Sequence, residues 1–185
     1  MRLQIVFRDQ VPDIRLVFLM IGAVALPLKI ELAQPDVFAE HIREFVAAGD
    51  MRRGRWMLGH TFAVRSTPAR GRGIGGRLVV PTINLAPYPG LLPAIGVYVT
   101  RLTIGDRRFQ SVTNVGNRPT FGEPSFAVES YILDFEPVGL TEETPLELEF
   151  LLRLRPEIAW PSPEALKAQI FKDVARAKRY FELVK

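Results

Sequence analysis

The segment from Arg70 to Arg77 (RGRGIGGR) has the composition of an anion-binding loop, with four glycines and three arginines. Glycines let consecutive backbone N–H groups converge on one anion, and arginine side chains add bidentate positive charge. A flexible loop in solvent has a similar composition, so the segment by itself leaves both interpretations open. The candidate phosphate-binding residues in this segment and just after it are Gly71, Arg72, Gly73, Gly75, Gly76, Arg77 and Pro81.

Two common nucleotide-binding motifs do not account for this segment. Its glycines satisfy G-x-G-x-x-G, but a dinucleotide-binding fold places a strand before that motif and a helix after it. Here the residues that follow, LVVPTINL, are typical of a strand. The P-loop pattern G-x-x-x-x-G-K-S/T does not occur in the sequence.

Thr82 and Asn84 come directly after this segment and are a candidate magnesium site. On a strand, alternate residues project from the same face, so a hydroxyl and an amide oxygen would lie side by side. Mg²⁺ prefers hard oxygen ligands, binds few protein groups and completes its shell with water and substrate phosphates. Two polar residues on a solvent-facing strand would show the same spacing, and this alternative stays open.

Glu129 is the candidate general base, because its predicted strand face also carries Ala127, Tyr131, Leu133 and Phe135. A carboxylate held among apolar and aromatic side chains suits proton abstraction. The opposite face of the same strand is nearly as apolar, so the pattern does not say which face is inside. A salt bridge or a position at a sheet edge would also explain this residue.

From His60 onward, the sequence predicts strands separated by glycine and proline turns. The last predicted strand alternates, with Leu152 and Leu154 on the face of Phe150 and with Leu151 as the exception. Strands without intervening helices favour an antiparallel barrel or sandwich. The predicted strands are Leu78–Leu85, Ile95–Ile104, Phe109–Val115, Phe126–Phe135 and Leu146–Leu154.

Helices are predicted on both sides of this strand region. Apolar spacing predicts two short helices near 38–58, divided at Gly49 and Asp50. An amphipathic helix is predicted over 163–184, with Ser162 as its N-cap and Pro163 in its first turn. Its apolar stripe is expected to pack on the barrel.

Composition excludes several kinds of site. The 185-residue chain contains no cysteine, which excludes disulfides, thiolate metal sites and cysteine nucleophiles. The chain has only two histidines, so few residues are available for a histidine metal cluster or a Ser-His-Asp triad. The net charge of +4 suits a phosphate-bearing ligand at least as well as nucleic acid. The apolar run Leu16–Leu28 is far shorter than the roughly 20 residues of a membrane span, and we expect a buried strand or helix there.

From about Phe62 to the C-terminus, the sequence resembles the riboflavin kinase family, especially the kinase half of bacterial bifunctional FAD synthetases. The matching blocks are RGRGIGGRLVVPTINL, GVYVT (96–100), SVTNVGNRPTFG (111–122), VESYILDF (128–135), LRPE (154–157) and the final helix. These blocks follow the family's order over most of the chain.

The resemblance implies a mainly β fold, a six-stranded antiparallel Greek-key barrel with a closing C-terminal helix and a short helical N-terminal appendage. It also implies that the glycine-rich segment binds the phosphates of ATP and that riboflavin is phosphorylated to FMN, with ADP as the second product. Thr82 and Asn84 would bind Mg²⁺, and Glu129 would be the base for the ribityl 5′-hydroxyl. Arg155, together with Asn84, would lie at the flavin. We therefore expect a cytoplasmic enzyme with no membrane, nucleic-acid or obligate protein partner.

The sequence departs from the family pattern near the site. Tyr131 stands where members commonly have histidine, and Val79-Val80 stands where they often have Gly-Phe. We expect differences in the binding pocket from these changes rather than loss of activity. Trp160 and Phe171 are the predicted apolar walls for the planar flavin ring.

Two domains are expected, a lead-in over 1–59 and a kinase barrel over 60–185. In the bifunctional enzymes, helices resembling residues 41–58 end the adenylyltransferase domain, but residues 1–60 lack that domain's H-x-G-H motif and any glycine cluster. We therefore expect FMN formation without FAD synthesis. Two alternatives stay open: an inactive barrel that binds flavin or nucleotide, and a basic nucleic-acid-binding barrel, for which no platform of exposed aromatics is evident.

Overall fold

The computed structural model describes residues 5–8, 16–21, 24–29, 35–69, 82–119, 124–134 and 139–184. The chain divides into two compact units, residues 1–41 and residues 42–185. The apolar run at residues 16–28, expected to be a strand or a helix, forms two paired antiparallel strands over residues 16–21 and 24–29. No helix in the described part of the chain is long and apolar enough to cross a membrane. The first unit contains a three-stranded antiparallel sheet made of β1 (Ile5–Arg8), β2 (Leu16–Ile21) and β3 (Val24–Lys29).

Two helices occupy the stretch predicted to be helical, α1 (Pro35–Ala47) and α2 (Met51–Leu58). Asp50 caps α2, because its side chain accepts a hydrogen bond at 3.0 Å from a backbone N–H in the first turn. Val46 of α1 and Met51 of α2 are buried in the main apolar cluster of the second unit. The end of α1 and the start of α2 therefore contribute to the same core as the barrel strands.

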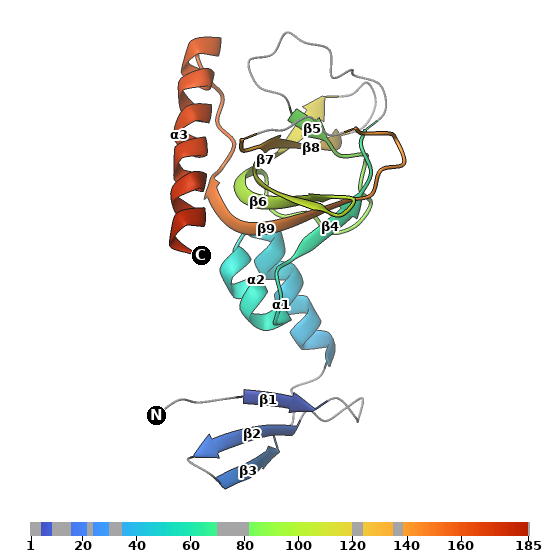
Figure 1. Ribbon diagram of the computed structural model, residues 1–185, viewed down its shortest axis with the longest axis vertical. Helices are drawn as coiled ribbons and strands as arrows, with labels where there is room; N and C mark the ends of the chain where they lie inside the picture. The colour runs from blue at the N-terminus through green and yellow to red at the C-terminus, as the bar shows by residue number, and fades with distance from the viewer. Residues whose placement is uncertain are drawn as a thin grey trace. The chain divides into compact units, whose positions relative to one another are not determined.

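Six antiparallel strands of the second unit form one sheet that curls into a barrel (Figure 1). They are β4 (Ala63–Ser66), β5 (Thr82–Asn84), β6 (Gly96–Ile104), β7 (Arg107–Pro119), β8 (Pro124–Ile132) and β9 (Leu146–Arg155). Their order in the sheet is β4-β9-β6-β7-β8-β5. β6, β7 and β8 form a meander and β9 returns to pair with β6, which is the predicted Greek-key arrangement.

Backbone contacts just beyond the ends of β4 and β5 join the two edges of this sheet. Pro68 and Leu85 form an isolated antiparallel bridge. Next to it, the N–H of Ala69 donates to the carbonyl of Asn84 at 2.8 Å. These contacts hold the short strand β5 on both sides, so its register against β8 is well defined.

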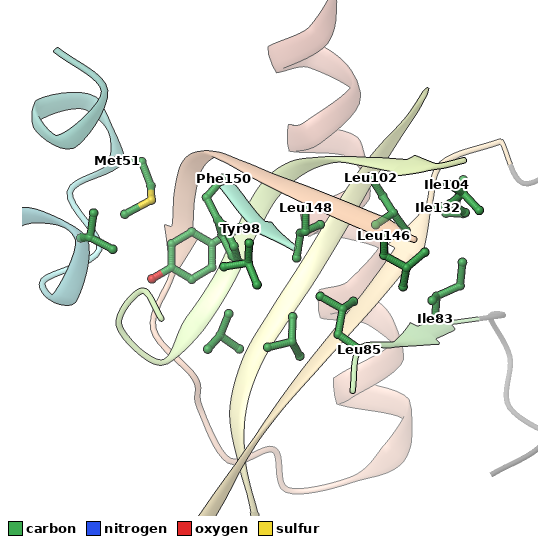
Figure 2. Packing of buried hydrophobic residues seen from close by; sticks show 14 residues of the cluster. Met51, Ile83, Leu85, Tyr98, Leu102, Ile104, Ile132, Leu146, Leu148 and Phe150 are labelled. Carbon is green, nitrogen blue, oxygen red and sulfur yellow. The ribbon is translucent and has the colours of Figure 1, made fainter. Parts of the chain in front are cut away.

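Apolar side chains from all six strands fill the barrel interior (Figure 2). Tyr98 and Phe150 are the largest of the fully buried side chains, and their rings meet edge to face with centroids 5.3 Å apart. Burial raises the pKa of Tyr98 to about 12, so its hydroxyl stays protonated and donates to the carbonyl of Ala94. The interior is therefore a packed core rather than a binding cavity.

The strand β9 keeps the predicted alternation up to Phe150, which points into the barrel (Figure 2). Leu151 is also buried, and it packs with Leu154 in a second apolar cluster. The pairing of β9 with β6 shifts register at this point, which is typical of a β-bulge. The prediction that Leu152 and Leu154 share the face of Phe150 was therefore wrong, because the extra residue turns the strand over.

The predicted C-terminal helix is present as α3 (Pro163–Leu183), which lies along the outside of the barrel (Figure 1). Ser162 caps it by accepting a backbone hydrogen bond at 3.2 Å. In its C-terminal half, Ala177 and Phe181 are buried in the second apolar cluster. In its N-terminal half, Leu166 is 41% exposed. Only the C-terminal half of α3 is therefore packed tightly on the strands.

Four hydroxyl side chains form a buried chain inside the barrel. Thr100 of β6 lies 2.7 Å from both Ser111 and Thr113 of β7. Thr113 donates in turn to Ser130 of β8 at 3.0 Å. All four residues are fully buried, so each hydroxyl depends on the others for hydrogen bonding.

Replacing Thr113 with Val is expected to lower the free energy of unfolding by about 1–3 kcal/mol. The side chain keeps its shape, but Thr100 and Ser130 each lose a buried hydrogen-bond partner. Urea unfolding measures the loss. Thr103→Val is the control, because Thr103 of the neighbouring strand β6 is only half-buried and has no side-chain hydrogen bond among the described residues. Equal losses in the two variants would contradict a role for the hydroxyl chain.

Candidate functional site

Glu129 and Tyr131 lie on the outer face of the barrel. On the same strand, Val128, Ser130 and Ile132 are buried and point inward. Because side chains alternate along a strand, the residues between them point outward. The structure thereby decides which face of β8 is inside, a question that the nearly symmetric sequence pattern left open.

One row of paired residues crosses five strands on this outer face. Glu129 of β8 pairs with Asn84 of β5 on one side and with Asn114 of β7 on the other. The row continues from Asn114 to Val97 of β6 and then to Arg155 of β9. Directly opposed residues have Cβ atoms roughly 4.5–5.5 Å apart. The register therefore places Glu129 between two side-chain amides, on the row that ends at Arg155.

Thr82 and Asn84 share this face of β5, and each carries a side-chain oxygen of the kind that a divalent metal prefers. Thr82 pairs with Tyr131, and its side chain is exposed, whereas that of Asn84 is half-buried. A hydroxyl and an amide oxygen next to the Glu129 carboxylate form a set of hard oxygen ligands. Among the residues that the structure describes, no group of three or more His, Cys, Asp or Glu could hold a metal. A metal here would take few protein ligands and complete its shell with water and phosphate.

A cavity of about 380 Å³ lies between this face, the N-terminal half of α3 and the segment that follows β9. Three predicted site residues, Thr82, Glu129 and Arg155, line it, and so does Trp160. The prediction that Phe171 is a second wall was wrong, because this side chain is 56% exposed and is not part of the lining. The aliphatic residues of the lining are Val97, Val112, Ile158, Leu166, Ile170 and Val174.

A buried ion pair holds Arg155 at the wall of the cavity. Its Nε lies 2.9 Å from Oδ2 of Asp173 on α3, whose side chain is only 2% exposed. The other carboxylate oxygen of Asp173 accepts a hydrogen bond from Gln169 at 2.9 Å. The Arg155 guanidinium lies 5.6 Å from the centre of the Trp160 ring, within the range of a cation–π contact. Arg155 and Trp160 thus form one preorganised part of the wall.

Three polar residues of the lining were not identified as site residues from the sequence: Asn114, Glu157 and Asp173. Each lies within one of the sequence blocks that carry the family resemblance. Membership of such a block is the signal from which the sequence could have identified these residues. Asp173 belongs to the final helix, one of the blocks that carry the resemblance, but the helical pattern assigns it no role. Its ion pair with Arg155 joins two elements whose contact the sequence does not reveal.

The candidate phosphate-binding residues lie outside the described residues. These are Gly71, Arg72, Gly73, Gly75, Gly76, Arg77 and Pro81, and Val79-Val80 lies outside them as well. The described chain ends at Ala69, which is hydrogen-bonded to Asn84, and begins again at Thr82. The described residues on either side of this gap, Ala69 and Thr82, therefore lie next to β5 and on it, respectively.

Comparison with known families and proteins gives one consistent result. The family model for flavokinase, described as riboflavin kinase, matches residues 58–181. The bifunctional riboflavin kinase/FMN adenylyltransferase of Haemophilus influenzae is 31% identical over 141 residues, which cover 76% of this chain and 45% of that protein. The Pseudomonas fluorescens protein of the same name is 31% identical over 150 residues, covering 80% and 48%. The chain spans about half the length of these relatives.

A solved structure has the same fold. It is described as a macrolide-efflux protein from Streptococcus pneumoniae, and it matches with a TM-score of 0.67 and 24% identity. The match covers 76% of this chain and 46% of that one. At this identity the likeness concerns the fold alone, and it agrees with the barrel and closing helix described above.

Proposed function

Because the chain belongs to the riboflavin kinase family, we propose that it transfers the γ-phosphate of ATP to the ribityl 5′-hydroxyl of riboflavin, giving FMN and ADP. The observation that best supports this proposal is the position of Glu129, between Asn84 and Asn114 at the wall of a cavity. The reaction needs a base at the acceptor hydroxyl and metal ligands close to it, and Glu129, Thr82 and Asn84 lie on one face of the barrel. ATP as the donor favours the cytoplasm as the place of reaction.

In the proposed mechanism, Glu129 takes the proton of the acceptor hydroxyl as its oxygen attacks the γ-phosphorus, and the bond to the bridging oxygen of ADP breaks. The amides of Asn84 and Asn114 flank the carboxylate and can keep it directed at the hydroxyl. Thr82 and Asn84 would hold Mg²⁺, which when bound offsets negative charge on the phosphates. The glycines and arginines of the segment 70–77 would bind the ATP phosphates.

The proposed flavin site is the apolar part of the cavity. A planar, largely apolar ring suits the space between Trp160 and the apolar residues of α3. Arg155 can donate hydrogen bonds to polar atoms at the edge of the ring. With the ring at that end, the ribityl chain would extend along the row toward Glu129 and Asn84.

One assay tests the proposed activity against the alternative of an inactive flavin-binding barrel. The purified chain is incubated with riboflavin, ATP and Mg²⁺, and the flavins are separated by chromatography. We expect FMN to form in proportion to enzyme and only when ATP and metal are present. Riboflavin that binds without conversion would favour the inactive barrel. With FMN as the starting flavin we expect no FAD from these 185 residues, and its formation would show that the N-terminal segment provides a second nucleotide site.

Replacing Asn84 with Ala is expected to raise the Mg²⁺ concentration for half-maximal activity by at least roughly 10-fold, the loss typical of disturbing a metal site. Riboflavin binding without metal should change much less, because the apolar part of the cavity is intact. A magnesium titration of activity measures the effect. Asn114→Ala removes an equal amide from the other side of Glu129 and should leave the titration midpoint unchanged. Equal midpoints in wild type and Asn84→Ala would remove Asn84 from the metal site.

A further inference from the structure

Glu157 reaches the cavity because Gly116 leaves room for its carboxylate. Glu157 lies in the segment after β9 and lines the cavity. A Cβ atom on Gly116 of β7 would lie 2.7 Å from Oε1 of Glu157 and 3.1 Å from Nδ2 of Asn114. Side-chain atoms essentially never approach that closely, so the missing side chain of Gly116 provides the space in which this carboxylate rests.

This space is close to the reacting end of the row. Gly116 is two residues from Asn114 on the same face of β7, and Asn114 is directly opposite Glu129. Diagonal neighbours on one face of a sheet are roughly 7–8 Å apart. The Glu157 carboxylate therefore lies beside the path of the ribityl chain, roughly 7–8 Å from the position of Glu129.

Glu157 is exposed to solvent, and no cationic side chain of the cavity pairs with its carboxylate. Arg155 lines the same cavity, but its guanidinium is paired with Asp173 and also donates to the carbonyl of Pro156 at 3.1 Å. Glu157 makes no hydrogen bond or ion pair with any part of the chain that the structure describes. A carboxylate can only accept hydrogen bonds, so it attracts hydroxyl donors and repels anions.

We propose that Glu157, in the space over Gly116, makes the cavity prefer the uncharged flavin alcohol to its phosphorylated product. This inference rests on the proposed function, since it takes riboflavin as the acceptor and FMN as the product. Riboflavin offers hydroxyl donors along its ribityl chain. FMN ends in a phosphate that carries a charge of about −1.5 to −2 at pH 7. The carboxylate therefore raises the dissociation constant of FMN and leaves that of riboflavin nearly unchanged, which speeds release of the product.

The test is the binding of each flavin, measured by fluorescence titration without ATP or metal, so that it does not depend on turnover. In Glu157→Gln we expect the dissociation constant of FMN to fall about 10-fold, the effect of one partly screened charge on the order of 10 Å from a phosphate. That of riboflavin should change by less than about 3-fold. Glu157→Asp keeps the charge and should retain most of the wild-type preference. Gly116→Ala keeps the charge but displaces it, and should lose part of the preference.

Glu143→Gln is the matched control, because it removes one exposed carboxylate from the turn before β9, outside the cavity lining. It should leave both dissociation constants unchanged. If the wild type binds riboflavin but Glu157→Gln has the same ratio of FMN to riboflavin affinity as the wild type, this proposal is wrong. The proposed function would still stand in that case. A wild type that binds neither flavin would overturn the proposed function itself.

Discussion

Replacing Glu129 with Gln is expected to lower kcat by roughly 10²–10⁴-fold, the usual contribution of a general base. Glutamine keeps the shape of the side chain and its place between Asn84 and Asn114, but it cannot take the proton of the acceptor hydroxyl. The flavin lies mainly against Trp160 and α3 in our proposal, so riboflavin affinity should stay within about 3-fold of wild type. Steady-state kinetics and flavin titration together measure the two effects.

The matched control for this variant is Glu147→Gln on β9. Glu147 pairs with Arg65 at 2.6 Å on the surface of the barrel and is not part of the cavity lining. Its replacement should leave kcat within about 2-fold, since exposed ion pairs contribute little. A Glu129→Gln enzyme with near wild-type turnover would show that another group takes the proton. Some activity should remain in any case, because positioning and charge neutralisation supply much of the catalysis in phosphoryl transfer.

Replacing Asp173 with Asn is expected to destabilise the protein by about 3 kcal/mol, the low end of the cost of removing one partner from a buried ion pair. The Asp173 side chain is 2% exposed and the Arg155 side chain is 13% exposed. The unpaired charge that the substitution leaves on Arg155 therefore has little contact with water. We take the low end because Arg155 lines the cavity, where water can partly solvate it. Riboflavin binding should weaken in parallel, because Arg155 loses the contact that orients it. Urea unfolding with an unchanged m-value and a flavin titration measure the two changes.

A surface ion pair on the same helix provides the comparison. Lys178 of α3 lies 2.7 Å from Oδ1 of Asp134, and both side chains are exposed. Asp134→Asn should lower the free energy of unfolding much less than Asp173→Asn does, because water and salt screen an exposed pair. Asparagine also tolerates the left-handed backbone at this position, where φ is 52°. Losses of equal size in Asp173→Asn and Asp134→Asn would contradict a structural role for the buried pair.

Local patterns in the sequence were sufficient to predict most of the elements. Turn residues and apolar runs predicted the strands that became β6, β7, β8 and β9. Apolar spacing with Ser162 and Pro163 predicted α3 nearly to the residue, because caps and helical periodicity are local properties. The order of short motifs predicted the family, which the comparison confirmed. The roles assigned to Thr82, Asn84, Glu129 and Arg155 remain predictions until the variants are measured.

Other features depended on contacts between residues far apart in the chain. Alternation shows which residues share a face, but both faces of β8 are apolar, so only closure of the barrel placed Glu129 outside. The bulge at Leu151 reverses the sheet face to which the following residues of β9 point, because the register of pairing with β6 shifts there. The ion pair of Arg155 with Asp173 and the space over Gly116 exist only once α3 and the segment after β9 are folded onto the strands. The sequence by itself therefore determined the elements and the family, because these depend on neighbouring residues. The tertiary structure decided the face, the cavity and the charges within it, because they depend on which distant segments meet.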